Sequence, residues 1–425
     1  MKIYGKIITA NVKIPCWLFI TKERKMKILM VNKFLYIKGG SETYVFKLSE
    51  YLKRSGHEIR YFGMLDERNI IPNDKKTMVV NVNFYNNSIK KVLNPLKIIY
   101  SHKARVKIRK IIKDFKPDIV HLNNYNYQVT PSILYEIAKF NIPIVQTVHD
   151  PNIICPSHKL YNCTNDSICE KCVGNRFYNC MLTRCIHGSF MKSLIGTAEA
   201  YTYHILHTYN KILYFICPSN FMSFKLIESG IEKKKVRVLH NFIENTNSME
   251  FVKKDYVLYF GRISHEKGIN TLLKSIKELN KIKFVFAGSG PLENELKGYE
   301  NLEYVGFKKG DELTRLIGES LFSIISSEIY ENCPMSVLES LSLSTPVIGS
   351  NIGGIPELID NKCGLLFEAG NHIDLTDKIK YLYENREILS DFSANCGRSV
   401  EKFSIKKYYN SLIAIYNDAI NSLKK

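Results

Sequence analysis

The chain has 425 residues, of which 45% are apolar and 24% charged, with a formal net charge of +19 at pH 7. This length and composition predict a globular protein of two or three domains and exclude an intrinsically disordered chain, while the absence of an apolar run of about 18 residues excludes a predicted transmembrane helix. The positive charge favours anionic partners, such as nucleic acid, an acidic membrane surface or phosphorylated substrates.

The first 25 residues have neither a continuous apolar core nor a small-residue cleavage site, so they do not predict a secretory signal. We expect residues 1–25 to be an extension and the first domain to begin at Met26. Strand patterns follow at Ile28–Asn32, Ile59–Met64, Met78–Val82, Asp118–Leu122, Ile142–His149 and Ile212–Cys217. Helical patterns separate these strands, and such alternation predicts a parallel sheet covered by helices on both faces.

The segment from Ser88 to Lys116 carries ten Lys or Arg residues and a single acid, Asp114. Its apolar residues recur at helical spacing, which predicts one or two basic amphipathic helices. Two interpretations fit this pattern: a helix packed on the core with a solvated basic face, or an interfacial helix that meets anionic lipid.

The α/β pattern starts again after Asn245–Lys254, a polar stretch suited to a linker. Its predicted strands are Tyr256–Phe260, Phe284–Ala287, Leu321–Ser326 and Pro346–Gly349. We therefore expect a first domain over 26–247, a second over 248–405, and a last helix over 406–425 that packs back on either domain. Two facing α/β domains place a ligand cleft between the carboxyl ends of their strands.

Several residues at these strand ends are suited to an anionic ligand. Gly39 and Gly40 stand where a phosphate can approach a helix N-terminus, although strand-to-helix turns also need glycine for steric reasons. Arg262 and Lys267 share the loop after Tyr256–Phe260, and a guanidinium with an ammonium suits a diphosphate. Solvated surface cations are the alternative interpretation of this pair.

Other candidates are carboxylates and a strand-end histidine. Glu331 and Glu339 stand eight positions apart around a probable helix start, and Gly353-Gly354-Ile355-Pro356-Glu357 follows. Two acceptors at different depths of one cleft can grip different sugar-like hydroxyls. His149 closes the strand at Ile142–His149, where it is either structural or functional, and Gly288 lies in a compact turn at the same predicted edge.

These motifs, in this order, resemble the group 1 glycosyltransferases, which are retaining enzymes with two Rossmann-like domains facing a cleft (the GT-B fold). The resemblance runs from about Met26 to the C-terminus. It implies that Arg262 and Lys267 hold the donor diphosphate as a leaving group and that Gly40 approaches it from the other domain. It also implies that Glu339 binds the hydroxyls of the donor ribose and that Glu331 contacts the donor sugar. His149 would then reach a sugar hydroxyl near the reacting carbon.

The chain departs from the family pattern at Asn332-Cys333-Pro334, where the family usually has a glycine-rich sequence after the glutamate. Pro334 has no backbone N–H, so one sugar contact is lost. We interpret this stretch as the place where the chain tunes which sugar it accepts.

Six cysteines fall between Cys155 and Cys185 in a polar, loop-like insert over about 155–190. The spacing of Cys169, Cys172, Cys180 and Cys185 predicts a structural zinc site that staples an insert too small to fold alone. Free packed thiols and disulfides are the alternatives. The family resemblance implies that the chemistry itself needs no metal or other cofactor.

The sequence therefore predicts a retaining glycosyltransferase that moves a sugar from a nucleotide-diphospho-sugar to a glycan acceptor, in particular a lipid-linked one, in surface polysaccharide synthesis. The expected location is cytoplasmic and peripheral at the inner membrane face, which supplies an anionic partner surface. A nucleotide-sugar epimerase of similar fold is one alternative. A zinc-containing nucleic-acid binder is another, but basic and aromatic residues form no recognisable platform, so we expect no nucleic acid.

Overall fold

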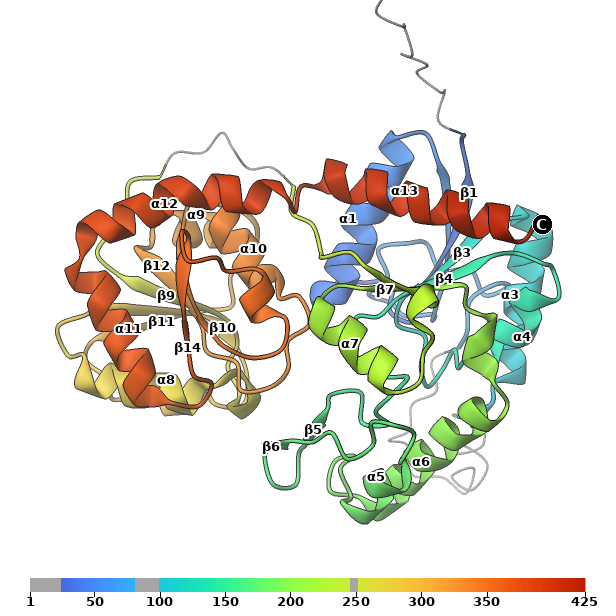
Figure 1. The fold of residues 1–425 in the computed structure, drawn as a ribbon, viewed down its shortest axis with the longest axis horizontal. Coiled ribbons are helices and arrows are strands. Elements are labelled where there is room, and N and C mark those ends of the chain that lie inside the picture. The colour runs from blue at the N-terminus through green and yellow to red at the C-terminus, as the bar shows by residue number, and fades with distance from the viewer. Residues whose placement is uncertain (1–23, 81–98, 245–250, 425) are drawn as a thin grey trace, which may run out of the picture.

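The computed structural model describes residues 24–80, 99–244 and 251–424. Two α/β domains lie side by side, as Figure 1 shows, each built on a six-stranded parallel sheet. The predicted fold class is confirmed. The elements of the first domain are β1 Lys27–Val31, α1 Gly40–Arg54, β2 Glu58–Phe62, α3 His102–Phe115, β3 Ile119–Leu122, α4 Ile133–Ala138, β4 Ile144–Thr147, β5 Tyr161–Asn162, β6 Ser167–Ile168, α5 Tyr178–Leu182, α6 Phe190–Ile205, β7 Tyr214–Cys217, α7 Asn220–Glu228 and β8 Val236–Val238.

The second domain and the last helix complete the chain. Their elements are β9 Val257–Arg262, α8 Ile269–Glu278, β10 Phe284–Ser289, β11 Leu302–Gly306, α9 Gly310–Glu319, β12 Phe322–Ile325, α10 Met335–Ser342, β13 Val347–Ser350, β14 Gly364–Phe367, α11 His372–Glu384, α12 Arg386–Glu401 and α13 Ile405–Ser422.

Both sheets are doubly wound, but they differ by one strand at the edge beyond the first strand of each domain. The second has the order β11-β10-β9-β12-β13-β14 and the first β2-β1-β3-β4-β7-β8. The strand predicted at Met78–Val82 lies only in part within the described residues. There it forms a single parallel bridge, between Val79 and Met64 just beyond β2. In both sheets the carboxyl ends of the central strands meet at one edge, where this topology places ligands.

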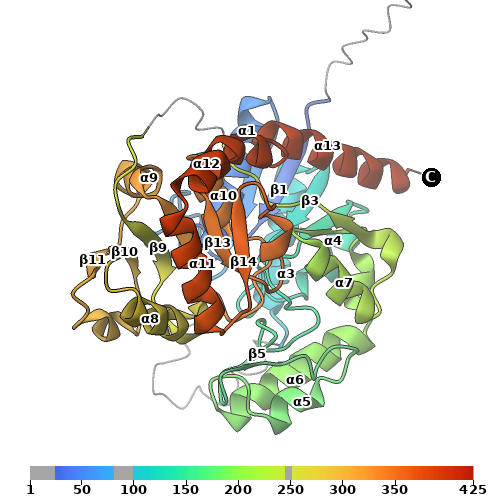
Figure 2. The ribbon, with the colours of Figure 1, turned by 60° about the vertical axis from the view of Figure 1, so that its left-hand side comes forward.

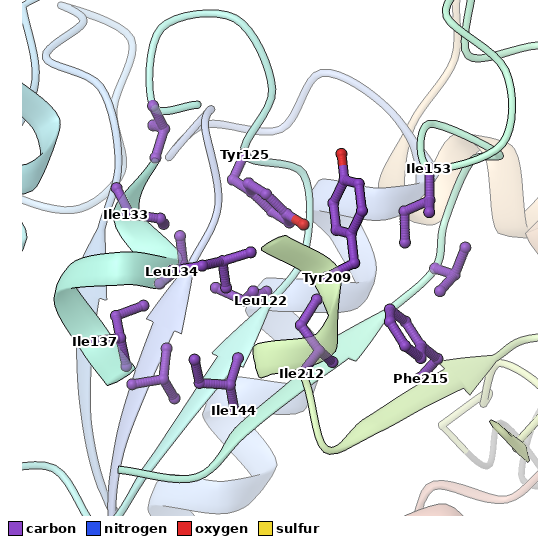
Figure 3. Packing of buried hydrophobic residues seen from close by; sticks show 14 of the residues in the cluster. Leu122, Tyr125, Ile133, Leu134, Ile137, Ile144, Ile153, Tyr209, Ile212 and Phe215 are labelled. Atoms are coloured by element: carbon purple, nitrogen blue, oxygen red, sulfur yellow. The ribbon is translucent and has the colours of Figure 1, made fainter. Parts of the chain in front are cut away.

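The central strands β3, β4, β12 and β13 are buried along their whole length, because helices cover both faces of each sheet. Figure 3 shows one of these cores, where Leu122 and Ile144 of the first sheet pack against Ile133 and Ile137 of α4. The sequence analysis did not predict β8, β11 and β14. All three lie at sheet edges, and β11 alternates too little between buried and exposed residues to give a clear pattern.

The basic segment forms the helix α3 over His102–Phe115, while residues 88–98 lie outside the described part of the chain. Its apolar side chains are buried in the core of the first domain. Arg105 and Arg109 lie 3.0 and 2.6 Å from the buried carboxylate of Glu136 on α4. The core-packed interpretation therefore fits α3, because its apolar stripe is already covered by protein.

The helix expected over 406–425 is α13, Ile405–Ser422, which leaves the second domain and lies along the first (Figure 1). Its tyrosines pack in the hydrophobic core of the first domain. Tyr409 Oη lies 3.0 Å from His57 Nε2, and Tyr416 Oη lies 2.6 Å from His121 Nδ1. Tyr408 Oη forms a hydrogen bond with Tyr44 Oη of α1.

Of the extension expected over 1–25, residues 1–23 lie outside the described part, and Arg24 pairs with Asp118 at 2.8 Å. Within the described residues, no helix has both the length and the apolar composition needed to span a bilayer.

Candidate functional site

Two adjoining cavities occupy the cleft between the domains, with volumes of about 330 and 530 Å³. Both are lined by residues of both domains. Shared between them are Gly40 of the first domain and Arg262, Lys267, Glu331, Pro334, Met335 and Ser336 of the second. The structure therefore brings most of the predicted site residues to one place.

The cations of this cleft lie at the end of β9. Arg262 is the last residue of β9 and is exposed on the cleft, and Lys267 follows in a single 3-10 turn. Lys267 Nζ forms an ion pair with the carboxylate of Glu331, which also accepts a hydrogen bond of 2.9 Å from Ser327 Oγ. Among the described residues no ion pair involves Arg262, so its charge stays available to an anion.

Two helix N-termini meet at the same cavity. Gly40 and Thr43 belong to the first turn of α1, and Met335 and Ser336 to the first turn of α10. The first N–H groups of a helix have no intrahelical acceptor and carry the positive end of the helix dipole. Together with Arg262, these termini form a site for an anion with several oxygens.

Glu331 and Glu339 both line the 330 Å³ cavity, one in the loop before α10 and the other inside the helix. Burial raises the pKa of Glu339, and Lys47 across the cleft opposes this effect. Oriented carboxylates of this kind are acceptors for ligand hydroxyls.

The glycine-rich segment Gly353-Gly354 supports this loop from behind. A Cβ atom on Gly354 would lie 1.8 Å from the Asn332 carbonyl oxygen, and Gly354 N donates to the Glu331 carbonyl at 2.7 Å. A larger residue would displace Glu331 and Asn332. The segment thus holds the carboxylate in place and does not itself line either cavity.

His149 lies at the end of β4 on the wall of the 530 Å³ cavity. Its Nε2 lies 2.9 Å from Asn123 Oδ1, and its ring packs edge-on against Tyr44 at 4.8 Å between centroids. Burial lowers the pKa of His149 to about 3, so the ring is neutral at physiological pH.

Asn332 does not point its amide at a sugar pocket. Its Nδ2 donates to the Val148 carbonyl at 2.7 Å, and its Oδ1 accepts from Ser219 Oγ at 2.6 Å. Because Val148 and Ser219 belong to the first domain, this side chain links the domains. All three residues of the stretch line the 530 Å³ cavity, and Pro334 also lines the 330 Å³ cavity, so the sugar-tuning role stays a prediction for the stretch.

Two predicted glycines lie away from the central cavities. Gly39 lines a third cavity, of about 300 Å³, in the first domain. Gly288 lines none of these three, and a Cβ atom there would lie 1.8 Å from the Gly261 carbonyl oxygen. The close approach of β9 and β10 explains the glycine at 288, and its contact with a donor stays a prediction.

The third cavity holds charged residues that the sequence analysis missed. Lys33, Glu42 and Asp150 line it, together with His158 of the insert. Burial lowers the pKa of Lys33 to about 8 and raises that of Asp150 to about 6. Asp150 Oδ1 is buried without a hydrogen-bond partner. Lys33 and Asp150 each follow a strand by a few residues, which is the signal that could have identified them.

Glu357 forms a second link between the domains that the sequence analysis did not assign. Its carboxylate accepts hydrogen bonds from the backbone N–H groups of Asn220 and Phe221, at 2.7 and 2.8 Å, and lies 2.9 Å from His240 Nε2. Burial opposes the ionised form, but these hydrogen bonds prevail and lower the pKa of Glu357. The carboxylate thus binds the N-terminus of α7.

The four cysteines of the predicted zinc site lie in the insert, and their binding of zinc stays a prediction. Among the described residues, no three His, Cys, Asp or Glu side chains are arranged to hold a metal ion, and Cys169, Cys172, Cys180 and Cys185 are free. Instead, Cys172, Cys180 and Cys185 pack with Phe177 in a small apolar cluster, and the sulfur atoms of Cys180 and Cys185 lie 3.1 Å apart. Buried thiols here behave as small apolar side chains. The arrangement fits the free-thiol alternative.

The two halves of the chain match two family profiles. Residues 38–246 match Glycosyltransferase Family 4, and residues 242–398 match Glycosyl transferases group 1. An uncharacterized glycosyltransferase of Methanocaldococcus jannaschii is 27% identical over 48% of this chain and 59% of its own length. The matched region spans only 31% of a second relative, the Arabidopsis thaliana sulfoquinovosyl transferase. An uncharacterized 42.6 kDa protein in the cps region of Klebsiella pneumoniae is 24% identical over 78% of this chain and 87% of its own.

Solved structures share the fold at low sequence identity. Sucrose-phosphate synthase of Thermosynechococcus elongatus superposes with a TM-score of 0.66 at 14% identity, over 94% of this chain and 100% of the other. Anabaena HepE in complex with UDP superposes with a TM-score of 0.64 at 15% identity, over 92% and 100%. These likenesses show the fold alone, which is the GT-B fold. The family profiles, which together match residues 38–398, show that the chain belongs to the group 1 glycosyltransferases.

Proposed function

We propose that this protein transfers a sugar, with retention of anomeric configuration, from a nucleotide-diphospho-sugar to a glycan acceptor. One observation carries the proposal: Arg262, Lys267 and the N-termini of α1 and α10 converge on a cavity that Glu331 and Glu339 also line. Positive groups surround the place for a diphosphate, and carboxylates stand where hydroxyls of a ribose and a sugar would lie.

The charges suit a leaving diphosphate. Negative charge grows on the phosphate as the sugar–oxygen bond breaks, and fixed cations and helix dipoles stabilise it at that moment. Lys267 already pairs with Glu331. An incoming diphosphate would therefore meet Arg262, which forms no ion pair within the described residues, and Lys267, which it would share with the carboxylate of Glu331.

The proposal of retention is supported by the groups that would surround the reacting carbon. We propose that the acceptor hydroxyl attacks the face from which the diphosphate leaves and passes its proton to the departing phosphate. Neutral His149 offers a hydrogen bond to a sugar hydroxyl and carries no charge that would compete with the phosphate. None of these steps uses a metal ion.

The acceptor side is open to the third cavity with Lys33 and Asp150. We propose a lipid-linked glycan acceptor in surface polysaccharide synthesis, with the protein acting in the cytoplasm at the inner membrane face. Support comes from relatives such as an Escherichia coli O-antigen biosynthesis glycosyltransferase, 27% identical over 53% of this chain and 65% of its own.

A thermal-shift screen of nucleoside diphosphates and their sugars tests the donor. We expect one base to raise the melting temperature, and the Arg262→Ala variant to lose most of that shift. NMR of the anomeric proton in the transfer product then tests retention. An inverted product would contradict the mechanism while leaving the donor site intact, and no response to any nucleotide would contradict the donor site.

A further inference from the structure

The helix α6, Phe190–Ile205, has its apolar residues on the outside. The solvent-facing side carries Phe190, Met191, Leu194 and Ile205, which are 46%, 60%, 37% and 70% exposed. The side facing the protein carries Ser193, Gly196, Thr197 and Glu199, which are small or polar, and one large residue, Tyr203, which is buried in the core of the first domain. Surface helices usually turn their apolar residues toward the core, so the exposed side of α6 is unusually apolar.

The exposed residues form one continuous stripe. At 3.6 residues per turn, Phe190, Leu194 and Ile205 project from the same side, with Met191 beside them. Half-buried Ile195 and Ala198 lie beside them, whereas Tyr201 packs edge-on against Phe177 at 5.3 Å between ring centroids. The stripe is about 22 Å long at 1.5 Å per residue. We call Phe190, Met191, Leu194, Ile195, Ala198 and Ile205 the outer face of α6.

The outer face lies at the far end of the first domain. Figures 1 and 2 both place α6 and α5 along the lower edge of the molecule. Exposed Tyr178 and Leu182 of the neighbouring α5, 47% and 65% exposed, add to the apolar surface of this end. Contiguous exposed apolar surface of this kind marks a binding site for a protein or a membrane.

The charge around the outer face selects between these partners. Residues 171–211 contain five cations, Lys171, Arg176, Arg184, Lys192 and Lys211, and a single acid, Glu199. Glu199 faces inward and is buried, so it contributes no exposed negative charge. Lys171, Arg176, Arg184 and Lys192 are exposed. The preceding part of the insert adds two acids, Glu170, which is paired with Lys225 at 2.8 Å, and exposed Asp166. An apolar face whose neighbouring exposed charges are mainly positive matches an interfacial helix on anionic lipid.

We propose that the outer face of α6 docks on the surface of an anionic lipid bilayer, with its apolar side chains among the acyl chains and the flanking cations at the headgroups. This surface differs from α3, whose apolar stripe is buried. The inference deepens the proposed function, because docking would present the cleft to a lipid-linked acceptor. Lipid binding is nevertheless measurable without donor or acceptor, so either idea can fail alone.

Vesicle co-sedimentation of the full chain tests the proposal. We expect binding to vesicles of 70% phosphatidylcholine and 30% phosphatidylglycerol, and little binding to pure phosphatidylcholine. The double variant Met191→Ser/Ile205→Ser should bind at least about tenfold more weakly. The matched control Ile373→Ser, which removes a 61% exposed isoleucine on α11, should bind like the wild type.

Charge is tested separately. Arg184→Glu/Lys192→Glu should weaken binding to the anionic vesicles, and 0.5 M salt should do the same to the wild type. Lys281→Glu/Lys297→Glu, in the second domain, has the same charge change and should have a much smaller effect. Absence of wild-type binding, or equal binding by the α6 variants, would overturn the proposal.

Two other occupants of the outer face give different results. A second copy of the chain would appear as a dimer in light scattering that the Met191→Ser/Ile205→Ser variant loses. Another part of the same chain would make that variant several degrees less stable in thermal unfolding. Either result, in place of weakened vesicle binding, would reject the lipid surface.

Discussion

The two domains are both built on a doubly wound parallel sheet but contribute different chemistry to the cleft. The 330 Å³ cavity takes its charged side chains, Arg262, Lys267, Glu331 and Glu339, from the second domain, whereas the first supplies the N-terminus of α1 there. In the 530 Å³ cavity the first domain adds the neutral ring of His149 together with Asp150 and Lys159. The first domain also carries the long insert between β4 and β7. Similar folds therefore serve unequal tasks, because the loops at the strand ends, and not the sheets, carry the ligand contacts.

The largest effect on activity is expected when a cation of the second domain is removed. Replacing Arg262 or Lys267 with alanine should lower kcat/KM on the order of 10²- to 10³-fold, since the leaving diphosphate loses its charge partner. Steady-state kinetics with the identified donor measure this loss. Lys274→Ala, on the exposed side of α8, is the control and should keep wild-type rates. Normal turnover by Arg262→Ala would remove that residue from the mechanism.

A smaller effect is expected at Glu339. Glu339→Ala should weaken nucleoside diphosphate binding about tenfold to hundredfold, which is the range for hydrogen bonds to a charged group. Because burial raises the pKa of Glu339, its carboxylate is protonated earlier on acidification than an ordinary glutamate. Calorimetric affinity should therefore fall as the pH drops through that raised pKa, and Glu339→Gln should lose this dependence. A glutamine variant with the wild-type pH profile would contradict the ribose contact.

Substitution in the Gly353-Gly354 segment behind the cleft should lower the stability of the fold. Gly354→Ala places a Cβ atom 1.8 Å from the Asn332 carbonyl oxygen, so we expect a loss of about 1–3 kcal/mol in the free energy of unfolding. Chemical denaturation measures it. Gly397→Ala is the matched control, because nothing lies within 4 Å of its Cβ position. Equal stability of the two variants would show that the loop shifts freely.

The link between the domains should be sensitive to acid. Hydrogen bonds hold the pKa of Glu357 below its ordinary value of 4.5, so its stabilising contribution is complete above that value and is lost as the pH falls through the lowered pKa. Glu357→Gln should lower the free energy of unfolding by about 1 kcal/mol at pH 7 and by less in acid. Glu387→Gln, on an exposed residue of α12, should cost nothing. A cost that does not change with pH would contradict the role of the charge.

The smallest effect concerns His149. With a pKa near 3, its ring stays neutral, so it should add no inflection to the activity profile between about pH 5 and pH 8. The wild-type and His149→Asn profiles should have the same shape, at different heights. An inflection near the ordinary histidine value in the wild type alone would show that the ring titrates in the working enzyme.

The sequence predicted the parts of the site that depend on local pattern. Arg262 and Gly40 follow strands that are unmistakably apolar, and strand ends meet at one edge of a parallel sheet. The edge strands β8, β11 and β14 were not predicted, because half-exposed strands lack a continuous apolar run. The zinc site stays a prediction, because cysteine spacing does not reveal where the sulfur atoms point.

By itself, the sequence predicted the family, the two α/β domains and the cations and carboxylates that line the cleft, since each prediction depends on short-range order along the chain. Only the tertiary structure decided that Asn332 and Glu357 link the domains and that Lys33 and Asp150 share a cavity. It alone decided that α6 presents its apolar side to the outside. Those facts depend on contacts between distant segments, and one helix has the same periodicity whichever side it buries.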